Sequence, residues 1–388
     1  MQNLSQWNFA MWISLPSAPA ISRHFVTLFA LGIHSAVVGC SPPPAPKSSP
    51  PITEVASTSP QTPSLRDKID TALEFTLQRR ILNTSEHGAW QILHGALAYQ
   101  LQFPTLIGQD GDARSAVEYA LQGGTIRGWT FEPGDMLPNG RRGLKAIVEP
   151  GTKKGQGHAD QWLAILAQCG LKQDQPIQLG DQTFLLSDLV EQVKYDAPFN
   201  AAREWSWTLI GLSYYLPWDA EWTARDEETW SIERMVRGEL GQQLNESACG
   251  GTHRLIGIAT ALNHYVDSGQ PLEGTWQGAH NVVRESVGLI LQDQNPDGSF
   301  SAQYLRRPSH SSDMATTLGT TGHMLEFLAV AMQDDELSHR QVEFAVNHLC
   351  DLFHATETLS LECGALYHAA HGLRLYRERR FGPREFTP

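Results

Sequence analysis

One kind of segment recurs along this 388-residue chain, in which small residues lead into an apolar run of helical length. The segment is clearest where Cys249-Gly250-Gly251-Thr252-His253-Arg254 continues into apolar residues as far as Leu262. Six such segments can be aligned, and their equivalent residues recur every 43 to 70 positions: Trp90, Asp160, Trp207, His253, His323 and Leu366. A repeat of this length is typical of helical hairpins arrayed as a solenoid or a closed ring.

The six repeated runs are apolar on nearly all sides and rich in Gly and Ala, so we expect them to be buried and closely packed. Amphipathic segments alternate with them, over residues 66–82, 114–121, 186–195, 232–240, 278–291 and 340–353. We therefore expect an all-α fold over residues 66–388, an (α/α)6 toroid of six inner and about six outer helices. One of the inner helices is expected to begin at Thr320.

Two insertions interrupt the repeat, at residues 123–157 and 175–183. Strand signals are scarce in the rest of the chain. The second insertion continues into an alternating pattern with Gly180-Asp181 at its middle, which predicts a small hairpin near residues 177–184.

The N-terminal stretch resembles a secretion signal. Arg23 and His24 precede the apolar run 25–33, which has signal-peptide length and is too short to cross a membrane comfortably. The run ends in Val37-Val38-Gly39-Cys40, which resembles a bacterial lipobox, in which the cysteine is lipidated. We expect a signal peptide over residues 1–39 and lipidation at Cys40, with an ordinary signal peptide and a chance cysteine as the alternative.

Residues 40–65 are dominated by Pro, Ser and Thr and cannot bury enough apolar surface to fold, which predicts an extended tether. Together these features predict a lipid anchor on a membrane of the cell envelope, facing the periplasm or exterior. The formal charge of −13 argues against a nucleic-acid partner, because phosphate binding needs a basic surface. The five cysteines lack paired spacing, so no disulfide framework is expected.

Residues 289–300 carry a first resemblance. Gln292 followed by Asp297-Gly298-Ser299-Phe300 resembles the glutamine-containing repeat of terpenoid-cyclase and protein-prenyltransferase toroids. In those proteins the glutamine caps a helix and the Gly-Ser turn starts the next segment. The resemblance implies a toroid fold rather than an activity, because the Asp-rich motif of the cyclases and the zinc pattern of the prenyltransferases are absent.

Gly322-His323-Met324-Leu325-Glu326-Phe327 carries a second resemblance, to the G-H-x-x-E-W segment of N-acylglucosamine 2-epimerase-like (α/α)6 barrels. Those enzymes use a histidine pair for proton abstraction and return. The resemblance implies that His323 is one acid/base group and Glu326 its orienting carboxylate, with His368 or His371 as the second histidine. The chain from Arg66 onward also resembles an uncharacterised family of bacterial envelope proteins, which implies no activity.

In a ring of helix pairs, the inner helices all begin at one rim, so residues of their first turns should converge on a central funnel. Helix N-termini add a positive potential there, and histidines with carboxylates can exchange protons near neutral pH. The candidate acid/base residues are His323, Glu326, His253, His158, Asp160, Glu204 and His371. The candidate ligand-binding residues are Trp90, His87, Trp207, Arg254, Thr252 and His368. For each residue the alternative is a structural role, as a helix cap, a helix-face pair or part of the core.

No HxxxH or HExxH pair supports a metal site, and we expect neither a metal nor a cofactor, with a convergent zinc site as the alternative. The leading hypothesis is an envelope lipoprotein whose funnel binds or processes a carbohydrate or other small ligand by His/carboxylate acid–base chemistry. A non-catalytic interaction scaffold in the envelope is the first alternative, and a terpenoid-cyclase-like enzyme is the second. The sequence does not specify the substrate or the oligomeric state.

Overall fold

The computed structural model describes residues 63–149, 157–200 and 204–387. The predicted signal peptide, Cys40 and most of the predicted tether lie outside these residues. The described chain is mostly helical, with twelve α-helices and nine short strands. The prediction of a largely helical fold is therefore confirmed.

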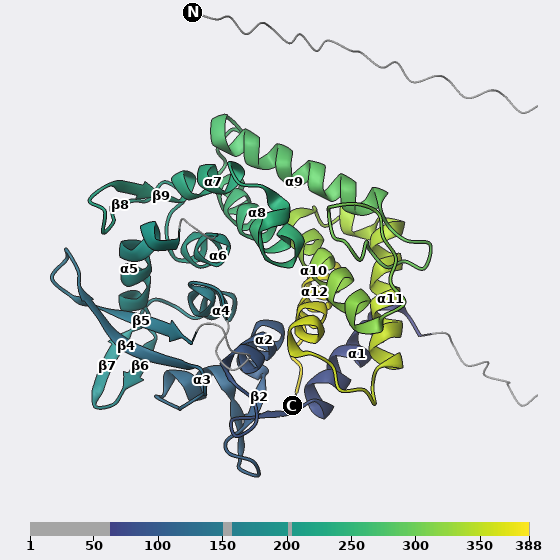
Figure 1. The fold of residues 1–388 in the computed structure, drawn as a ribbon, viewed down its shortest axis with the longest axis horizontal. Helices are drawn as coiled ribbons and strands as arrows, with labels where there is room; N and C mark the ends of the chain where they lie inside the picture. Colours follow the sequence, from purple (N-terminus) through teal and green to yellow (C-terminus); the bar gives the residue numbers. More distant parts are fainter. Residues whose placement is uncertain (1–62, 150–156, 201–203, 388) are drawn as a thin grey trace, which may run out of the picture. The chain divides into compact units, whose positions relative to one another are not determined.

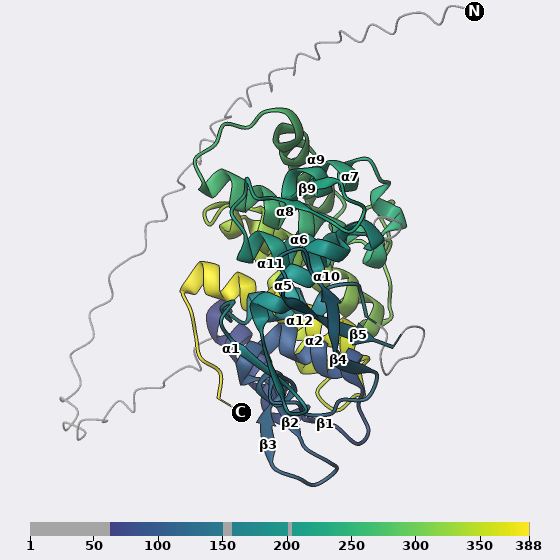
Figure 2. The same ribbon diagram turned by 90° about the vertical axis from the view of Figure 1, so that its left-hand side faces the viewer.

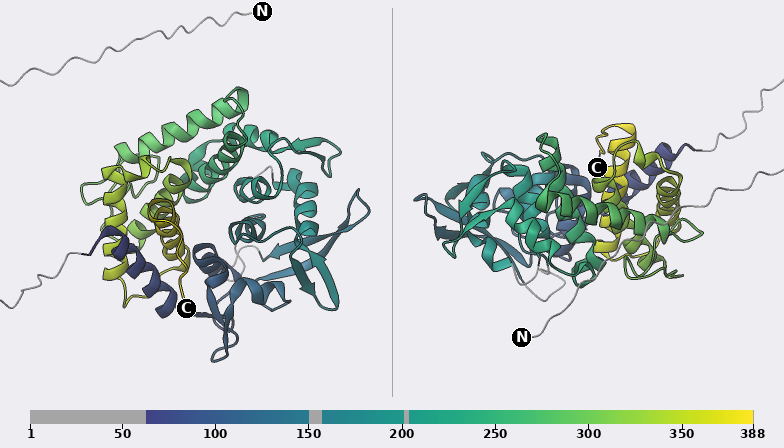
Figure 3. Two further views of the ribbon diagram at one scale, coloured as in Figure 1. Left: turned by 180° about the vertical axis from the view of Figure 1, so that it is seen from behind. Right: turned by 90° about the horizontal axis from the view of Figure 1, so that it is seen from above.

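Six helices pack on one another in cyclic order. Each contacts the next along the chain, and the last packs back on the first (Figure 1). They are α2 (Ala89–Tyr99), α4 (Gln161–Gln168), α6 (Ser206–Tyr215), α8 (Thr252–Asp267), α10 (Met314–Ala331) and α12 (Cys363–Phe381). Seen from behind, α12 lies beside α2 (Figure 3). These helices contain the six apolar segments of the repeat, and most of their residues are buried.

The other six helices lie outside this inner set (Figure 1). They are α1 (Leu65–Arg79), α3 (Ala116–Leu121), α5 (Leu186–Asp196), α7 (Ile232–Leu240), α9 (Gly274–Gln292) and α11 (Arg340–Ala355). Each follows the predicted amphipathic segment to within a few residues. In α9 the buried residues fall every three or four positions from Trp276 to Ile290, so one stripe faces the core and the rest faces solvent.

Four small sheets lie outside the inner helices (Figures 1 and 2). The predicted hairpin is confirmed as β6 (Pro176–Leu179) and β7 (Gln182–Leu185), which pair antiparallel. The all-α prediction missed the other strands: β1 (Leu82–Asn83), β2 (Pro104–Leu106), β3 (Ala113–Ser115), β4 (Trp129–Met136), β5 (Arg142–Val148), β8 (Glu221–Thr223) and β9 (Thr229–Ser231). Most span only two or three residues, too few for a period of two to stand out, and Pro133-Gly134 interrupts the alternation in β4.

The packing of α10 against α12 determines where the side chains at the centre of the molecule lie. A Cβ atom added at Gly322 would lie 2.5 Å from Ala369 Cα, and one at Gly372 would lie 2.9 Å from Glu326 N. The two backbones therefore approach closely only because both positions are glycine. Helix α10 begins at Met314 rather than at the predicted Thr320, with Asp313 Oδ2 accepting a hydrogen bond from Thr316 N at 2.8 Å. Threonine and glycine are weak helix formers, and tertiary packing overrides their propensity here.

Candidate functional site

Five histidines form a cluster in the middle of the inner helices, in which the rings of His253, His323 and His368 are all neighbours of one another. Their ring centroids are 5.1 Å apart from His94 to His368, 3.9 Å from His368 to His323, 5.5 Å from His323 to His253 and 4.8 Å from His253 to His158. They come from α2, α12, α10, α8 and the residues just before α4. All except His158 are buried. The structure thus brings together histidines that the sequence analysis placed on separate helices.

Burial keeps several of these rings neutral. Desolvation and the neighbouring His368 lower the pKa of His94 to about 3 and that of His323 to about 3. Desolvation, followed by the charges of His158 and His368, holds the pKa of His253 well below its usual value. A neutral imidazole keeps one nitrogen lone pair, which makes it available as a base or as a ligand.

Glu326 joins two of the inner-helix histidines. Its carboxylate accepts hydrogen bonds from Nδ1 of His368 at 2.8 Å and from Nδ1 of His371 at 2.6 Å. Burial opposes its ionisation, but the charges and hydrogen bonds of the two imidazoles outweigh burial and hold its pKa well below the usual range. Because both Nδ1–H groups point at one carboxylate, the Nε2 atoms of the two rings are the positions available for proton exchange.

The implied pairing of Glu326 with His323 is wrong. His323 instead donates from Nδ1 to the carbonyl of Gly319, at 2.7 Å and four residues earlier on the same helix. Side chains on a helix lean toward its N-terminus, so the His323 ring lies over the preceding turn while Glu326 reaches across to α12. The carboxylate of the Gly-His-x-x-Glu segment therefore orients the histidines of α12.

A cavity of about 260 Å³ lies next to this group. Glu326 and His371 form part of its lining, and Asn263, His264 and Asp267 of α8 lie along another side. A second void of about 10 Å³ lies against the histidine cluster, and its lining includes Glu326, His368 and His253. Both spaces are bordered by Glu326, which is only 2% exposed as a residue.

This cavity lies at the opposite end from the predicted funnel. Tyr214, Asp267 and Val330 belong to the last turns of α6, α8 and α10, whereas the funnel was expected at the first turns. The rings of Trp90 and Trp207 pack against His94 and His253 nearer the helix starts, with centroids 4.7 and 5.4 Å apart. The two tryptophans predicted to bind a ligand thus lie against the histidine cluster and outside the larger cavity.

His158 and Glu204 form a second polar pair. His158 Nδ1 lies 2.8 Å from Glu204 Oε1, and Glu204 also accepts a short hydrogen bond from Ser247. Asp160, although closer to His158 in sequence, instead accepts hydrogen bonds from Asn200 and from Thr208, both at 2.6 Å. Desolvation raises the pKa of Asp160 to about 6. A cavity of about 250 Å³ beside β5 and α5 is lined in part by His158 and Asp160.

Three predicted ligand-binding residues contact other parts of the protein. Arg254 forms a buried ion pair with Glu239 of α7 and donates to the carbonyl of Gln243 at 2.6 Å. Thr252 donates to the carbonyl of Cys249 at 2.9 Å, and His87 accepts at Nδ1 from the backbone of Asn83 at 3.1 Å. None of the three lines the cavity beside Glu326. The sequence analysis missed Asn263, His264 and Asp267, although a polar end on an apolar helix was a usable signal.

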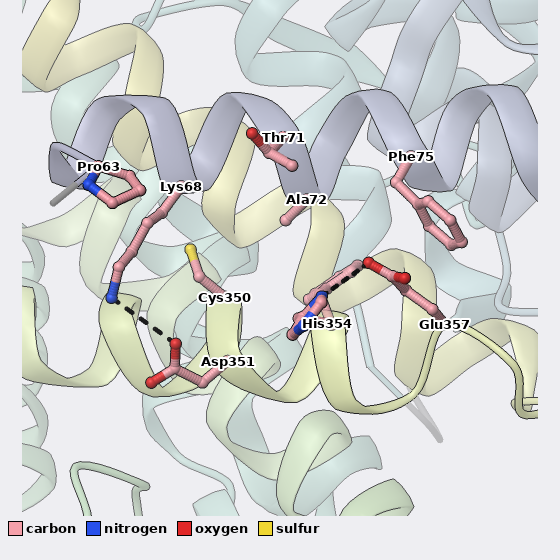
Figure 4. A pocket seen from close by; sticks show the side chains of 10 residues that line it. Pro63, Lys68, Thr71, Ala72, Phe75, Cys350, Asp351, His354 and Glu357 are labelled. Atoms are coloured by element: carbon pink, nitrogen blue, oxygen red, sulfur yellow. Dashed lines mark hydrogen bonds and ion pairs between the residues drawn. The ribbon is translucent and has the colours of Figure 1, made fainter. Parts of the chain in front are cut away.

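A groove of about 260 Å³ lies on the outside, between α1 and α11 (Figure 4). Its lining is mainly apolar, with Phe75 and Cys350 among the contributing side chains. Its charged groups are paired, Lys68 with Asp351 at 3.7 Å and His354 with Glu357 at 2.9 Å. The groove gathers no set of titratable groups comparable to that around Glu326.

Among the described residues, no helix is both long enough and apolar enough to span a membrane. No family profile, curated protein or solved structure matches this chain. Any activity must therefore be inferred from the side chains and the cavity themselves.

Proposed function

We propose that the chain is an envelope lipoprotein whose (α/α)6 toroid processes a small polar ligand, a carbohydrate in the first instance, by acid–base chemistry. The observation that carries the proposal is one buried carboxylate, Glu326, which holds His371 at the wall of a cavity of about 260 Å³ and His368 at the adjoining void of about 10 Å³. The fold part is supported by the cyclic packing of the six inner helices and by the six outer helices that cover them.

The chemistry follows from the hydrogen bonds of Glu326. A carboxylate that accepts from Nδ1–H raises the basicity of Nε2 and stabilises the imidazolium formed when Nε2 takes a proton. With two imidazoles on one carboxylate, one ring removes a proton from carbon next to a carbonyl and the other returns a proton. The electron pair of the broken C–H bond rests meanwhile on the carbonyl oxygen as an enolate.

The cavity matches a ligand of monosaccharide size. At about 260 Å³ it is smaller than the pockets that bury drug-sized molecules. Asn263, Asp267 and Thr260 offer donors and acceptors for hydroxyl groups, and the exposed Tyr214 offers an aromatic face at the outer end. Glu326, the carboxylate that holds both imidazoles, is the glutamate of the epimerase-like segment.

The test uses deuterium exchange, which requires no knowledge of the product. The full chain is incubated in D₂O with N-acetylglucosamine, N-acetylmannosamine and a panel of aldoses and ketoses, and NMR follows loss of the proton next to the carbonyl. We expect exchange with at least one sugar. Glu326→Gln and His371→Asn should each slow it by about 10²–10⁴-fold, because positioned acid–base groups contribute that much.

His354→Asn is the matched control, since His354 also pairs with a glutamate but lies exposed on the outer α11. This variant should exchange at the wild-type rate. A wild-type chain that neither binds nor exchanges any sugar of the panel would contradict the proposed activity and leave the interaction scaffold as the better account.

The lipid anchor is tested separately. Cells expressing the full chain are labelled with radioactive palmitate and fractionated. Label and membrane association should both be present in the wild type and absent in Cys40→Ser. An unlabelled wild-type chain, or a labelled Cys40→Ser variant, would show that Cys40 is not lipidated.

A further inference from the structure

The donor atoms of Cys249, His253 and His323 converge in the centre of the molecule. One ligand atom from each, the thiol sulfur and one nitrogen of each ring, lies within 4.8 Å of the other two. Some point therefore lies within about 2.8 Å of all three atoms, which is 4.8 Å divided by the square root of three. Zinc bonds to sulfur and imidazole nitrogen are roughly 2.0–2.3 Å long, so inward shifts of under about 1 Å complete the coordination.

Two of the three residues have buried ring nitrogens with no protein partner. Within the described chain, neither Nδ1 nor Nε2 of His253 has a hydrogen-bond partner, and His253 is 3% exposed. His323 Nε2 is likewise without a partner, and His323 is 4% exposed. Buried polar atoms are normally hydrogen-bonded, and leaving one unpaired destabilises the fold. A bound ion would account for Nε2 of His323 and for one of the two nitrogens of His253.

The hydrogen bond of His323 presents the correct nitrogen. Nδ1 donates to the Gly319 carbonyl at 2.7 Å, which fixes the proton on Nδ1 and leaves the lone pair on Nε2. Metal-binding histidines commonly have their second nitrogen fixed by a backbone carbonyl in this way.

The backbone around Cys249 is held in an unusual conformation. Cys249 has φ 50° and is followed by Gly250 at φ 65° and Gly251 at φ 97°, three left-handed residues in succession. A non-glycine residue in this region is strained, and the conformation persists only where the surroundings enforce it. A Cβ atom at Gly250 would lie 2.4 Å from the Tyr304 ring, and one at Gly251 would lie 2.5 Å from the Leu244 carbonyl oxygen. The turn is thus held between Tyr304 and Leu244 immediately before His253.

We propose that Cys249, His253 and His323 form a binding site for one divalent transition-metal ion of the zinc class, with a fourth coordination position left for water or a ligand. A thiolate and two neutral imidazoles are the donors that zinc prefers, and three protein ligands with one open position are typical of reactive zinc sites. Binding expels the thiol proton of Cys249 to solvent as the Sγ–metal bond forms. The site goes beyond the proposed sugar chemistry and does not depend on it.

A second set of donors shares His253. His158, Glu204 and His253 also place one ligand atom each within 4.8 Å of one another. In that set His158 and Glu204 are already paired at 2.8 Å, and Glu204 also accepts from Ser247. His158 and Glu204 are thus already engaged with each other, and this set offers no thiolate, the donor that zinc prefers; both points favour the site containing Cys249.

The test titrates metal alone, with no sugar present. The full chain is stripped with a chelator and titrated with Co²⁺, followed by absorbance, and with Zn²⁺, followed by calorimetry and by proton release. We expect one ion per chain, a thiolate-to-cobalt charge-transfer band and release of a proton. Cys249→Ser should abolish the band, and both Cys249→Ser and His323→Asn should weaken Zn²⁺ binding at least 10- to 100-fold, the range seen even for outer-shell partners.

Cys363→Ser is the matched control, because Cys363 is also a partly buried thiol but lies at the start of α12 outside the site. It should keep both the band and the affinity. Near-UV circular dichroism first establishes that each variant is folded, and His323→Asn tests the site if Cys249→Ser is not. If neither variant folds, the charge-transfer band and proton release of the wild type decide.

The site is refuted if the wild type binds no metal or gives no thiolate band. It is also refuted if affinity is lost in Glu204→Gln and kept in Cys249→Ser, which would assign the ion to the second set. Sugar exchange without metal binding would overturn this site alone, and metal binding without exchange would overturn only the proposed activity.

Discussion

Gly322 of the inner α10 and Gly288 of the outer α9 lie in opposite surroundings. In the inner α10, a Cβ atom at Gly322 would lie 2.5 to 2.8 Å from backbone and side-chain atoms of Ala369, whereas nothing lies within 4 Å of one at Gly288 in the outer α9. Histidines differ in the same way, since His323 is buried and His354 on α11 is exposed. The same residue type therefore has different consequences in the two layers, because contact and desolvation set its energy.

The largest loss of stability is expected for an ion pair that connects an inner helix to an outer helix. Arg254 of the inner α8 and Glu239 of the outer α7 form an ion pair, and their side chains are 3% and 1% exposed. Arg254→Met leaves a buried carboxylate without its cation, which should lower the free energy of unfolding by about 3–5 kcal/mol. Urea denaturation at neutral pH measures the change.

The double variant Arg254→Met/Glu239→Gln provides the control. The amide oxygen of the substituted side chain can still accept the hydrogen bond that Trp205 N donates to Glu239, and no buried charge remains. We expect the double variant to recover at least half of the lost stability. If Arg254→Met lowers the free energy of unfolding by less than about 1 kcal/mol, the packing of α7 against α8 does not depend on this ion pair.

The second effect is acid sensitivity of the inner layer. The pKa values of His94 and His323 are about 3 in the folded state against 6.5 when exposed, so the unfolded chain binds more protons between these values. Stability must therefore fall as pH drops below 6.5, by roughly 2–3 kcal/mol per histidine at pH 4.5. Asp160 acts in the opposite direction, because its pKa of about 6 in the folded state lies above the usual 3.8. Protonation of Asp160 in the folded state therefore adds roughly 2 kcal/mol to the stability by pH 4.5.

Because the pKa of His253 is also held well below its usual value, we expect a net loss of at least about 3 kcal/mol between pH 7 and pH 4.5. Urea denaturation at several pH values across that range measures this loss. Asp160→Asn should steepen the loss because it removes the opposing group. His354→Gln, in the outer layer, should leave the slope unchanged. A flat profile for the wild type would mean that the central histidines are hydrated rather than desolvated.

The fold was more predictable than the site. All six apolar segments and six amphipathic segments became helices, because burial on all sides and burial along one stripe leave distinct sequence patterns. Strand β5 has no comparable sequence pattern. Its strand structure depends on pairing with β4, and this pairing is seen only in the structure. The Gln292 of the cyclase-like segment was also misleading, because Gln294 is the residue that donates to the carbonyls of Gly298 and Gln341.

The site depends on contacts between helices that sequence spacing does not contain. Glu326 and His323 are three residues apart and were paired for that reason, whereas Glu326 bonds His368 and His371 across the α10–α12 contact. Cys249 and His323 are also far apart in the sequence, so no metal-type spacing links them. Side chains fill one end of the inner helices, and which end this is depends on how Trp90 and Trp207 pack. The sequence does not show that packing.

The third effect tests the close approach of α10 and α12 directly. Gly322→Ala places a methyl group 2.5 Å from Ala369 Cα, which must push the two helices apart. Overpacking of this kind costs about 1–3 kcal/mol. Because Glu326 and His371 stand on these helices, sugar exchange should fall together with stability. Unchanged urea denaturation would show that the contact yields without cost.

The smallest effect has the opposite sign and completes the comparison. Gly288 lies within the outer α9, and nothing lies within 4 Å of an added Cβ atom. Alanine is favoured over glycine inside a helix by about 0.5–1 kcal/mol, so Gly288→Ala should stabilise the protein by that amount. The same glycine-to-alanine change thus raises the urea midpoint in the outer layer and lowers it at Gly322. If both variants shift the midpoint in the same direction, helix propensity rather than contact governs the two layers, and the distinction drawn between them is wrong.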